Sequence, residues 1–532
     1  MSSKLFFGGP IITMEEPLYA EAILISRGKI AAVGKLAEVE AQAPEDTRRI
    51  DLKGKALMPA FLDAHSHISQ FAATLGLAPL EGLRSFEEIG AALQRYREEN
   101  KLPPDQWLIG FGYDHNYLRE QRHPDAAFLD SVCSENPVIV VHASGHMGAV
   151  NSAGLRRLGI TAETVAPEGG KIGHKPDGQP DGYLEENAFI RMAGGVMSFS
   201  GTQIMEYLEK AQQIYLSFGI TTAQDGKVAR KDFDLLAEAA KEGRLSIDVV
   251  AYADMKTSEA LLEQQAIYRN YQRRLRLGGY KIFLDGSPQG KTAWMTKPYE
   301  GETDGYRGYP IYTDEAVREF LQKATEENVQ LLAHCNGDAA ADQLISAYEK
   351  VRQEARRQED IRPVMIHAQT IRKDQVAKMA RLGMIASFFT AHTYYWGDVH
   401  RKNLGEERAK EISPAATAQK EGLVYTFHQD TPVLLPDMMR TVWCAVNRVS
   451  KSGASMGEEE RISVLDALKA VTLNAAYQYF EEDRKGSLKA GKLADLVILE
   501  RDPLKEPKTT LCDIRVLETL KEGSTVYLRE KI

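Results

Sequence analysis

The chain has 532 residues, of which 43% are hydrophobic, and a formal net charge of -9 from 66 basic and 75 acidic side chains. This mild acidity argues against a nucleic-acid surface, which would need a basic patch, and the four scattered cysteines argue against a disulfide framework or a zinc ribbon. The first ten residues hold too short an apolar run for a signal peptide, and no segment approaches the ~20 apolar residues of a membrane span, so we expect a cytoplasmic protein without membrane partners.

Apolar runs near the two ends of the chain predict short strands. Two of them lie early, at 21–25 and 29–34, and two lie late, at 496–499 and 525–528.

Between these ends, eight further apolar runs alternate with stretches of helical character. This alternation is typical of an α/β protein with a parallel sheet, and eight strands are the number that a (β/α)8 TIM-like barrel requires. The predicted strands lie near 57–65, 219–225, 247–254, 277–285, 329–334, 363–367, 384–389 and 423–430.

A long stretch at 70–215 separates the first of these strands from the second. It contains its own apolar runs at 107–111 and 138–142, with charged helix-like stretches between them. A long insertion after a barrel strand projects over the catalytic face. We therefore expect this insertion to cap the site and to set substrate choice.

Candidate metal ligands follow five of the eight strands. His65 and His67 are two residues apart, so on a strand they share one face and can bind one ion. Imidazole is the commonest metal ligand and suits zinc, iron or nickel. The other candidates stand at or near the carboxyl ends of the fourth, fifth, sixth and eighth strands: Lys281, His334, His367 and Asp430. Active sites of (β/α)8 barrels lie at that face.

Each candidate also has an ordinary structural interpretation. An isolated His-x-His is often a solvated pair in a loop, and histidines such as His334 or His367 are often satisfied structural residues. Lys281 has the alternative of an ion-paired lysine, and an aspartate such as Asp430, before a turn with proline, is often a helix N-cap. The order of the whole set along alternating strands favours the metal site.

The ordered motifs resemble those of the amidohydrolase superfamily, and within it the branch called amidohydrolase family 3, whose members include uncharacterised metal-dependent hydrolases. The resemblance covers nearly the whole chain. It rests on Asp63-Ala64-His65-Ser66-His67, Gly145-His146-Met147 with Asn151-Ser152-Ala153, Gly182-Tyr183-Leu184-Glu185-Glu186, Gly219-Ile220-Thr221-Thr222-Ala223-Gln224-Asp225, Lys281 with Asp285-Gly286-Ser287, His334 with Gly337-Asp338, Arg362 with His367-Ala368-Gln369, Asp430-Thr431-Pro432, and the tail from Gly486 to Leu496.

The resemblance implies a site with two divalent metal ions, usually zinc, held by the four histidines and Asp430. It also implies a carboxylated Lys281 whose carbamate bridges the ions; a bare ammonium has three donors and no acceptor, so it would repel a metal. Asp430 would take the proton of the bridging water, whose pKa the two cations lower. The implied activity is hydrolysis of an amide-type C–N bond, other than a peptide bond, in a small molecule by a metal-bridging hydroxide.

Two other functional classes stay open at this point. One is a mononuclear-metal deaminase of a ring compound, against which Lys281 counts, because a one-metal site does not need a bridging carbamate. The other is a non-catalytic binding or regulatory homologue, against which the intact ligand set counts.

The resemblance also predicts the domain organisation. Both ends of the chain, 1–56 plus 485–532, would form a small β-sandwich beside a barrel domain over 57–484, with 70–215 as the cap insertion. A homodimer is the default assembly, because dimers are the commonest soluble oligomers.

Two candidate substrate contacts lie in the insertion. His146 and Glu186 have family-like spacing, although a packing histidine and a solvated glutamate are equally good interpretations. His115 and His174 lie in polar surroundings typical of loops and receive no role.

Three further candidate substrate contacts lie in the barrel. Trp294 and His392, the latter within an aromatic run at 388–396, would line a pocket for an apolar group, although an aromatic cluster is more often ordinary core. His428 stands where the family usually has a small residue. It lies two residues from Asp430, which on a strand is the same face, so it would contact substrate or support the ligands, with a plain packing change as the alternative.

Overall fold

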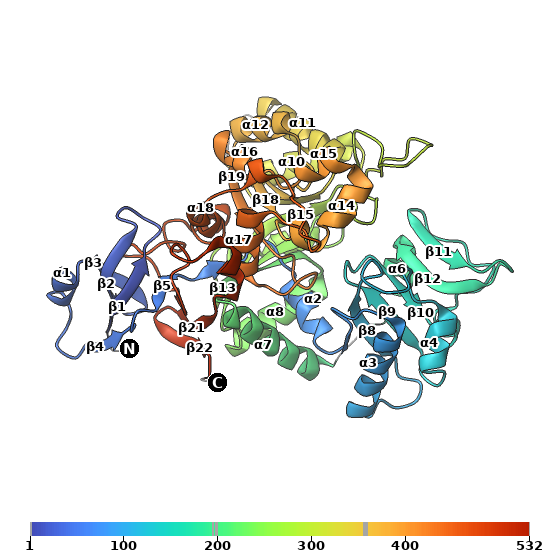
Figure 1. The fold of residues 1–532 in the computed structure, drawn as a ribbon, viewed down its shortest axis with the longest axis horizontal. Helices are drawn as coiled ribbons and strands as arrows, with labels where there is room; N and C mark the ends of the chain where they lie inside the picture. Colours follow the sequence, from blue (N-terminus) through green and yellow to red (C-terminus); the bar gives the residue numbers. More distant parts are fainter. Residues whose placement is uncertain (1–2, 194–195, 197–199, 355–359, 531–532) are drawn as a thin grey trace. The chain divides into compact units, whose positions relative to one another are not determined.

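The structure is a computed structural model that describes residues 3–193, 196, 200–354 and 360–530, and its chain divides into two units (Figure 1). One unit combines Met1–Ile68 with Gln212–Ile532, and the other is Ser69–Ala211. Each unit has its own sheets and is described by itself.

Within the described residues of the larger unit, eight parallel strands form one sheet in the order in which they occur along the chain. They are β6 (Phe61–Leu62), β13 (Ile220–Val228), β14 (Asp248–Asp254), β15 (Leu275–Phe283), β16 (Gln330–Cys335), β17 (Val364–His367), β18 (Ile385–Phe388) and β19 (Val424–Phe427). The sheet curls, because the residues that follow its first and last strands meet: the His67 N–H donates to the Thr431 carbonyl at 2.8 Å. The parallel α/β sheet of a TIM-like barrel is therefore present.

Helices separate these strands along the chain. They are α7 (Gly201–Ser217), α8 (Arg230–Glu242), α9 (Gln265–Tyr268), α10 (Asp314–Glu326), α11 (Asp338–Glu354), α12 (Lys373–Leu382), α13 (His392–Tyr395), α14 (Gly397–Leu404), α15 (Glu406–Lys410) and α16 (Ala415–Lys420), with α17 (Met438–Asn447), α18 (Val464–Ala470) and α19 (Leu473–Gln478) after the last strand. Among the described residues, no helix combines the length and the apolar character that crossing a membrane requires.

Helix α10 illustrates why these segments fold as they do. The Thr313 side chain accepts a hydrogen bond from the Ala316 N–H and caps the helix, and the two acidic residues of the first turn favour the helix dipole. Val317, Leu321 and Ala324 recur at helical spacing and are buried, so one stripe of the helix packs inward. The strands are instead apolar throughout, as in β17, because helices and the barrel interior cover both faces.

The two ends of the chain build a second sheet in the same unit. Its strands run in the order β22 (Ser524–Leu528), β21 (Val516–Lys521), β20 (Leu496–Leu499), β5 (Ala56–Pro59), β1 (Lys4–Ile12), β2 (Tyr19–Ser26) and β3 (Lys29–Gly34), with β4 (Arg48–Asp51) pairing with β1 and the short helix α1 (Leu36–Glu40) after β3. All four strands predicted near the chain ends lie in this sheet. Its closure into a β-sandwich, and a separate domain over 1–56 plus 485–532, stay predictions.

The single strand predicted at 57–65 is wrong, because the chain changes sheets inside it. Strand β5 pairs with β20 of the terminal sheet, whereas β6 pairs with β13 of the barrel sheet. The switch occurs at two consecutive residues: the Ala60 N–H donates to the Asp495 carbonyl, and the Phe61 N–H donates to the Gly219 carbonyl, each at 2.9 Å. Both halves are apolar and buried, so hydrophobicity alone gave no sign of the break.

The smaller unit contains a six-stranded sheet in the order β11 (Gly170–His174), β12 (Pro180–Glu186), β10 (Met147–Val150), β9 (Val138–His142), β8 (Leu108–Tyr113) and β7 (Ala78–Pro79). Helices α3 (Phe86–Glu99), α4 (Ala126–Val132), α5 (Ser152–Leu158) and α6 (Asn187–Met192) accompany it, and α2 (Ile68–Thr74) leads into it. Two buried apolar clusters lie within this unit, one around Leu184 and Phe189 and one around Leu93 and Leu129. The insertion therefore has a core of its own.

Candidate metal centre

The six predicted ligands converge at the carboxyl-terminal edge of the barrel sheet, where neighbouring parallel strands end together. Lys281 lies in β15, His334 in β16 and His367 at the end of β17, while His65 and His67 follow β6 and Asp430 follows β19. We call these six residues the barrel cluster.

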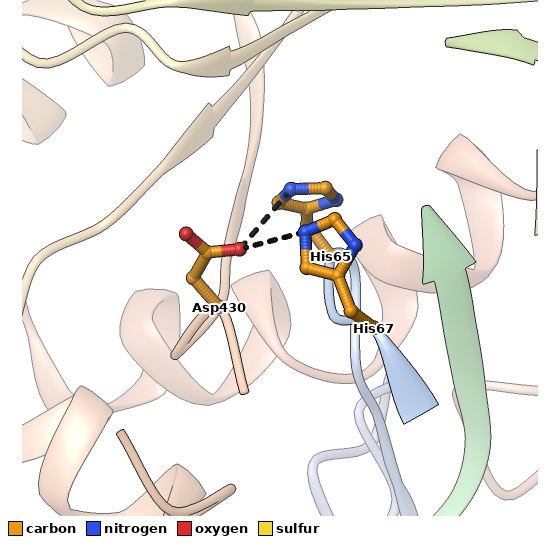
Figure 2. Close-up of side chains that lie close together, drawn as sticks. All are labelled: His65, His67 and Asp430. Atoms are coloured by element: carbon orange, nitrogen blue, oxygen red, sulfur yellow. Dashed lines mark ion pairs between the residues drawn. The ribbon is translucent and has the colours of Figure 1, made fainter. Parts of the chain in front are cut away.

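Three members of the barrel cluster form a compact triad (Figure 2). The Nε2 atoms of His65 and His67 each lie 3.3 Å from Asp430 Oδ1, and one ligand atom from each residue falls within 4.8 Å of the other two. The expectation that His65 and His67 share one face of a strand is wrong. Strand β6 ends at Leu62, and both histidines belong to the turn that follows it. The turn, held by the bond between His67 and Thr431, aims both rings at Asp430.

Hydrogen bonds from the far side of each ring set which nitrogen faces the carboxylate. His65 Nδ1 lies 2.6 Å from Gln224 Oε1, and His67 Nδ1 lies 2.7 Å from the Gly226 carbonyl oxygen. Both partners are acceptors, so each Nδ1 carries the proton and each Nε2 presents a lone pair. Ligand histidines in metal sites are oriented by partners of this kind.

A second group of ligands lies on the other side of the same carboxylate. His334 Nδ1 and His367 Nε2 are 3.1 Å apart, and His367 Nε2 lies 3.9 Å from Asp430 Oδ2. Lys281 Nζ lies 3.4 Å from His65 Nε2. Asp430 Oδ1 thus faces His65 and His67, whereas Oδ2 lies toward His367.

The donor set fits a divalent ion. Asp430 Oδ1 is buried and has no hydrogen-bond partner among the described residues, although two imidazole nitrogens face it. A buried carboxylate oxygen is costly to leave unpaired, and a cation between the oxygen and the nitrogens would satisfy all three. Imidazole and carboxylate together suit zinc and its neighbours in the first transition row.

Electrostatics keep the ligands in the form that binds cations. Burial raises the pKa of Asp430, but the neighbouring imidazoles of His67, His65 and His367 outweigh it and hold that pKa well below its usual range. Burial and neighbouring cationic groups lower the pKa values of His65 and His367 well below 6.5. At neutral pH the carboxylate is therefore ionised and the rings are neutral.

Lys281 is fully buried at the centre of the cluster. Burial is the main cause that moves the pKa of its amine well below 10.5, and Asp430 opposes the shift only in part. The shift favours the neutral amine, whose nitrogen has a free lone pair.

His428 contacts the barrel cluster from behind. Its Nε2 lies 3.2 Å from His367 Nδ1, and its Nδ1 lies 2.9 Å from Ser387 Oγ. Strand β19 ends at Phe427, so the argument that His428 shares a strand face with Asp430 is wrong. The ring instead lies behind His367 and orients it; a contact of His428 with substrate stays a prediction.

The aromatic run after β18 approaches the same edge of the sheet. The Phe389 ring lies 6.0 Å from the His367 ring and 5.2 Å from the His428 ring. His392 stacks on His400, with 2.9 Å between Nδ1 and Nε2, and its ring also lies 4.6 Å from that of Phe389. His392 is thus one ring removed from the ligands, and its role toward substrate stays a prediction.

Trp294 lies in a different place from the ligands. It lines a cavity of about 330 Å³ together with charged residues such as Asp314, Arg318 and Lys350, and no member of the barrel cluster is among the described lining residues. The expectation that Trp294 joins the aromatic run in one pocket therefore rests on the sequence alone.

His146 and Glu186 pair with each other in the smaller unit. His146 Nδ1 lies 2.9 Å from Glu186 Oε2, and the Glu186 N–H donates to the His146 carbonyl at 2.7 Å. The spacing of the two motifs in the sequence therefore corresponds to a real contact, while their role toward substrate stays a prediction.

Sequence reasoning missed three residues that hold the site in place. Gln224 orients His65 and also donates to the Ala64 carbonyl, and Tyr479 donates to the Asp63 carbonyl at 2.5 Å. Asp285 is buried and accepts hydrogen bonds from three backbone N–H groups after β15 and β16. Burial raises the pKa of Asp285 to about 7. Only the positions of Gln224 and Asp285 near strand ends offered a signal.

With this geometry established, comparison with known proteins defines the class of the chain. A model of the amidohydrolase family matches residues 48–527, so the chain belongs to the amidohydrolase family. The crystal structure of an uncharacterized metal-dependent hydrolase from Pyrococcus horikoshii OT3 superposes with a TM-score of 0.77 at 25% sequence identity, covering 99% of this chain and all of that one.

Two relatives of full length have more particular names. The chain is 28% identical over 529 residues to an N-substituted formamide deformylase of Arthrobacter pascens, covering 96% of this chain and 95% of that protein. It is also 28% identical over 545 residues to the protein LONG AFTER FAR-RED 3 of Arabidopsis thaliana, covering 99% and 92% respectively.

Proposed function

We propose that this protein is an enzyme that hydrolyses an amide-type C–N bond, other than a peptide bond, in a small molecule. The observation that carries the proposal is that one oxygen of Asp430 faces His65 and His67, while the other lies toward His367, which in turn contacts His334. A cytoplasmic location, a homodimer and the absence of nucleic-acid partners belong to the same proposal.

The barrel cluster would hold two divalent ions, zinc by preference. His65 and His67 would serve one ion, His334 and His367 the other, and Asp430 has an oxygen toward each group. Bound there, the ions would polarise the substrate carbonyl and lower the pKa of water toward neutrality.

Lys281 is the residue that would join the two groups. Its amine is buried, which favours the neutral form, and in that form it can add to carbon dioxide, forming an N–C bond and releasing a proton, so that the side chain becomes an anionic oxygen ligand. An unmodified amine is a poor partner here, because a protonated one would repel cations and offers no acceptor. We therefore include a carbamate on Lys281 in the proposal.

Asp430 is the residue that would move the proton. It is ionised at neutral pH, since its pKa is held well below the usual range, and its oxygens face the space between the ligand pairs. It would accept the proton that the attacking water loses and donate it to the leaving nitrogen as the C–N bond breaks. The proton returns to product, so the carboxylate is restored after each cycle.

The test combines metal content with turnover. Protein purified without chelator would be assayed by plasma mass spectrometry and against a panel of N-formyl and N-acyl amines, with release of the free amine as the readout. We expect close to two barrel ions per chain and cleavage of at least one amide. The panel takes N-substituted formamides first, because one relative carries that activity in its name.

Other outcomes would change the proposal. One barrel ion with an unmodified Lys281 and release of ammonia from ring compounds would replace it with a deaminase. Failure to retain any ion after reconstitution would replace it with a binding protein.

A further inference from the structure

A second group of two histidines and one aspartate lies in the smaller unit. Asp114 and His115 follow the end of β8, and His142 is the last residue of β9. These two strands are parallel neighbours in which Tyr113 is opposite His142, so their carboxyl ends bring the three side chains to one place. We call Asp114, His115 and His142 the insertion cluster.

The distances within the insertion cluster suit ligands of one ion better than hydrogen bonds. His142 Nε2 lies 3.5 Å and His115 Nδ1 lies 3.9 Å from Asp114 Oδ1, and one ligand atom from each residue falls within 4.8 Å of the other two. Hydrogen bonds between such atoms are about 2.7–3.2 Å long. Ligands that share a tetrahedral ion at about 2.1 Å are roughly 3.4 Å apart.

The two ring nitrogens that face Asp114 are buried and lack the hydrogen bonds that buried polar atoms normally make. His142 Nε2 and His115 Nδ1 have no hydrogen-bond partner among the residues that the structure describes. Buried polar atoms are nearly always satisfied, which makes two such atoms beside one carboxylate a sign of a missing partner.

Neighbouring side chains orient the insertion cluster. His142 Nδ1 lies 2.9 Å from Ser144 Oγ and also within 3.1 Å of the Ser144 N–H. The Ser144 N–H donates to this nitrogen, so a ring that binds a cation through Nε2 would carry its proton on Nδ1 and donate to the hydroxyl instead. Asn116 donates twice to Asp114 Oδ1, at 2.9 Å each, which uses two of the roughly four lone-pair sites of the carboxylate.

A third imidazole ring, that of His123, borders the insertion cluster. The rings of His123 and His115 are 3.9 Å apart, and the Tyr113 hydroxyl lies 3.0 Å from His123 Nδ1. His123 therefore fixes the plane of His115 while its own Nδ1 is occupied.

We propose that the insertion cluster binds one divalent transition-metal ion of the zinc class, separate from the barrel cluster. Asp114, His115 and His142 supply three ligands and leave one position of a tetrahedral ion for water. The ion joins the turn after β8 to the turn after β9, and the second of these turns leads directly to His146. The site does not depend on the reaction proposed for the barrel.

The test measures metal content site by site in the full-length protein. After removal of metal by chelator, the chain is reloaded with zinc, passed over a gel-filtration column and assayed by plasma mass spectrometry. His142→Ala and His115→Ala should each lose one equivalent of zinc relative to the unsubstituted protein. His174→Ala is the matched control, because His174 is exposed in the same unit and should lose none.

A second series separates the two clusters. His67→Ala should remove zinc from the barrel alone, and combined with His142→Ala the losses should add. Circular dichroism checks that each variant folds; if His142→Ala does not, His115→Gln, at a half-buried position, takes its place. Anomalous diffraction at the zinc edge should show a peak between Asp114, His115 and His142. Equal zinc in all insertion variants, or loss of that equivalent on gel filtration, would overturn the proposal.

Discussion

The triad of His65, His67 and Asp430 within the barrel cluster has the same composition as the insertion cluster, two histidines and an aspartate, but the two groups differ in how firmly their side chains are held. In the barrel, His65 and His67 both donate from Nδ1 to fixed acceptors, so each Nε2 atom carries a lone pair and can only accept. In the insertion, His142 Nδ1 contacts both a hydroxyl and an N–H group, so its proton has two available positions.

From this difference we expect orientation, more than the identity of the ligands, to decide how tightly each cluster would hold a metal ion. Partners behind the ligands typically change metal affinity by about 10–100-fold. The barrel should therefore retain its ions at chelator concentrations that already empty the insertion.

The largest expected effect is the loss of turnover when Asp430 of the barrel cluster is replaced. Asp430→Asn keeps the shape of the side chain but removes the charge that accepts a proton, so turnover should fall by at least about a hundredfold. Amine release from the best amide of the panel is the readout, with unchanged thermal melting as the control for folding. Near-normal turnover would remove Asp430 from its proposed role.

A paired substitution behind the ligands would sharpen the comparison. His428→Asn removes the ring that orients His367, and zinc affinity of the barrel should fall by about 10–100-fold in a competition titration against a chelator. Ser144→Ala removes only the hydroxyl behind His142 and leaves the N–H contact, so the insertion should lose less. The reverse order of effects would contradict our account of orientation.

A change in stability comes next in size. Asp285→Asn turns one of the oxygens that accept three backbone N–H groups into a donor, so the free energy of unfolding should fall by about 1–3 kcal/mol. Asp374→Asn is the control, because that carboxylate is exposed. Urea denaturation measures both, and equal stability of the two variants would show that Asp285 is dispensable.

The smallest effect is a dependence of stability on pH that both units share. Burial lowers the pKa of His400 in the larger unit and of His123 in the smaller unit to about 3, from 6.5 in the unfolded chain. Below 6.5 the unfolded state binds more protons, so the metal-free protein should lose up to about 1.4 kcal/mol per pH unit for each such histidine.

Thermal melting of the metal-free protein as pH falls through 6.5 checks this expectation. His400→Asn and His123→Asn should each flatten the profile by a similar amount. A profile that is already flat in the unsubstituted protein would contradict the burial of these rings.

Much of the fold could be predicted because parallel barrel strands are apolar on both faces and stand out in the sequence. The split of 57–65 into β5 and β6 could not, since which sheet a buried strand joins depends on distant partners such as Asp495 and Gly219. The pattern of apolar residues shows which faces of a strand are buried, but it does not show which other strand the segment pairs with.

The barrel cluster was visible because its ligands follow predicted strands in order. The insertion cluster was not, because Asp114 and His115 lie in a polar loop, and their nearness to His142 depends on the pairing of β8 with β9. His428 was noticed only as a departure from a pattern, and its contact with His367 required coordinates.

The passage of the chain from the terminal sheet to the barrel sheet at Ala60 and Phe61 has a consequence for protein synthesis. His65 and His67 leave the ribosome early, yet the strand before them is anchored to β20 near the other end of the chain, and the carboxylate that they face is Asp430. Non-local contacts of this kind form late and slowly. A nascent chain therefore carries His65 and His67 without their partner Asp430 for most of translation, and an interrupted chain that ends before Asp430 lacks the carboxylate that both rings face.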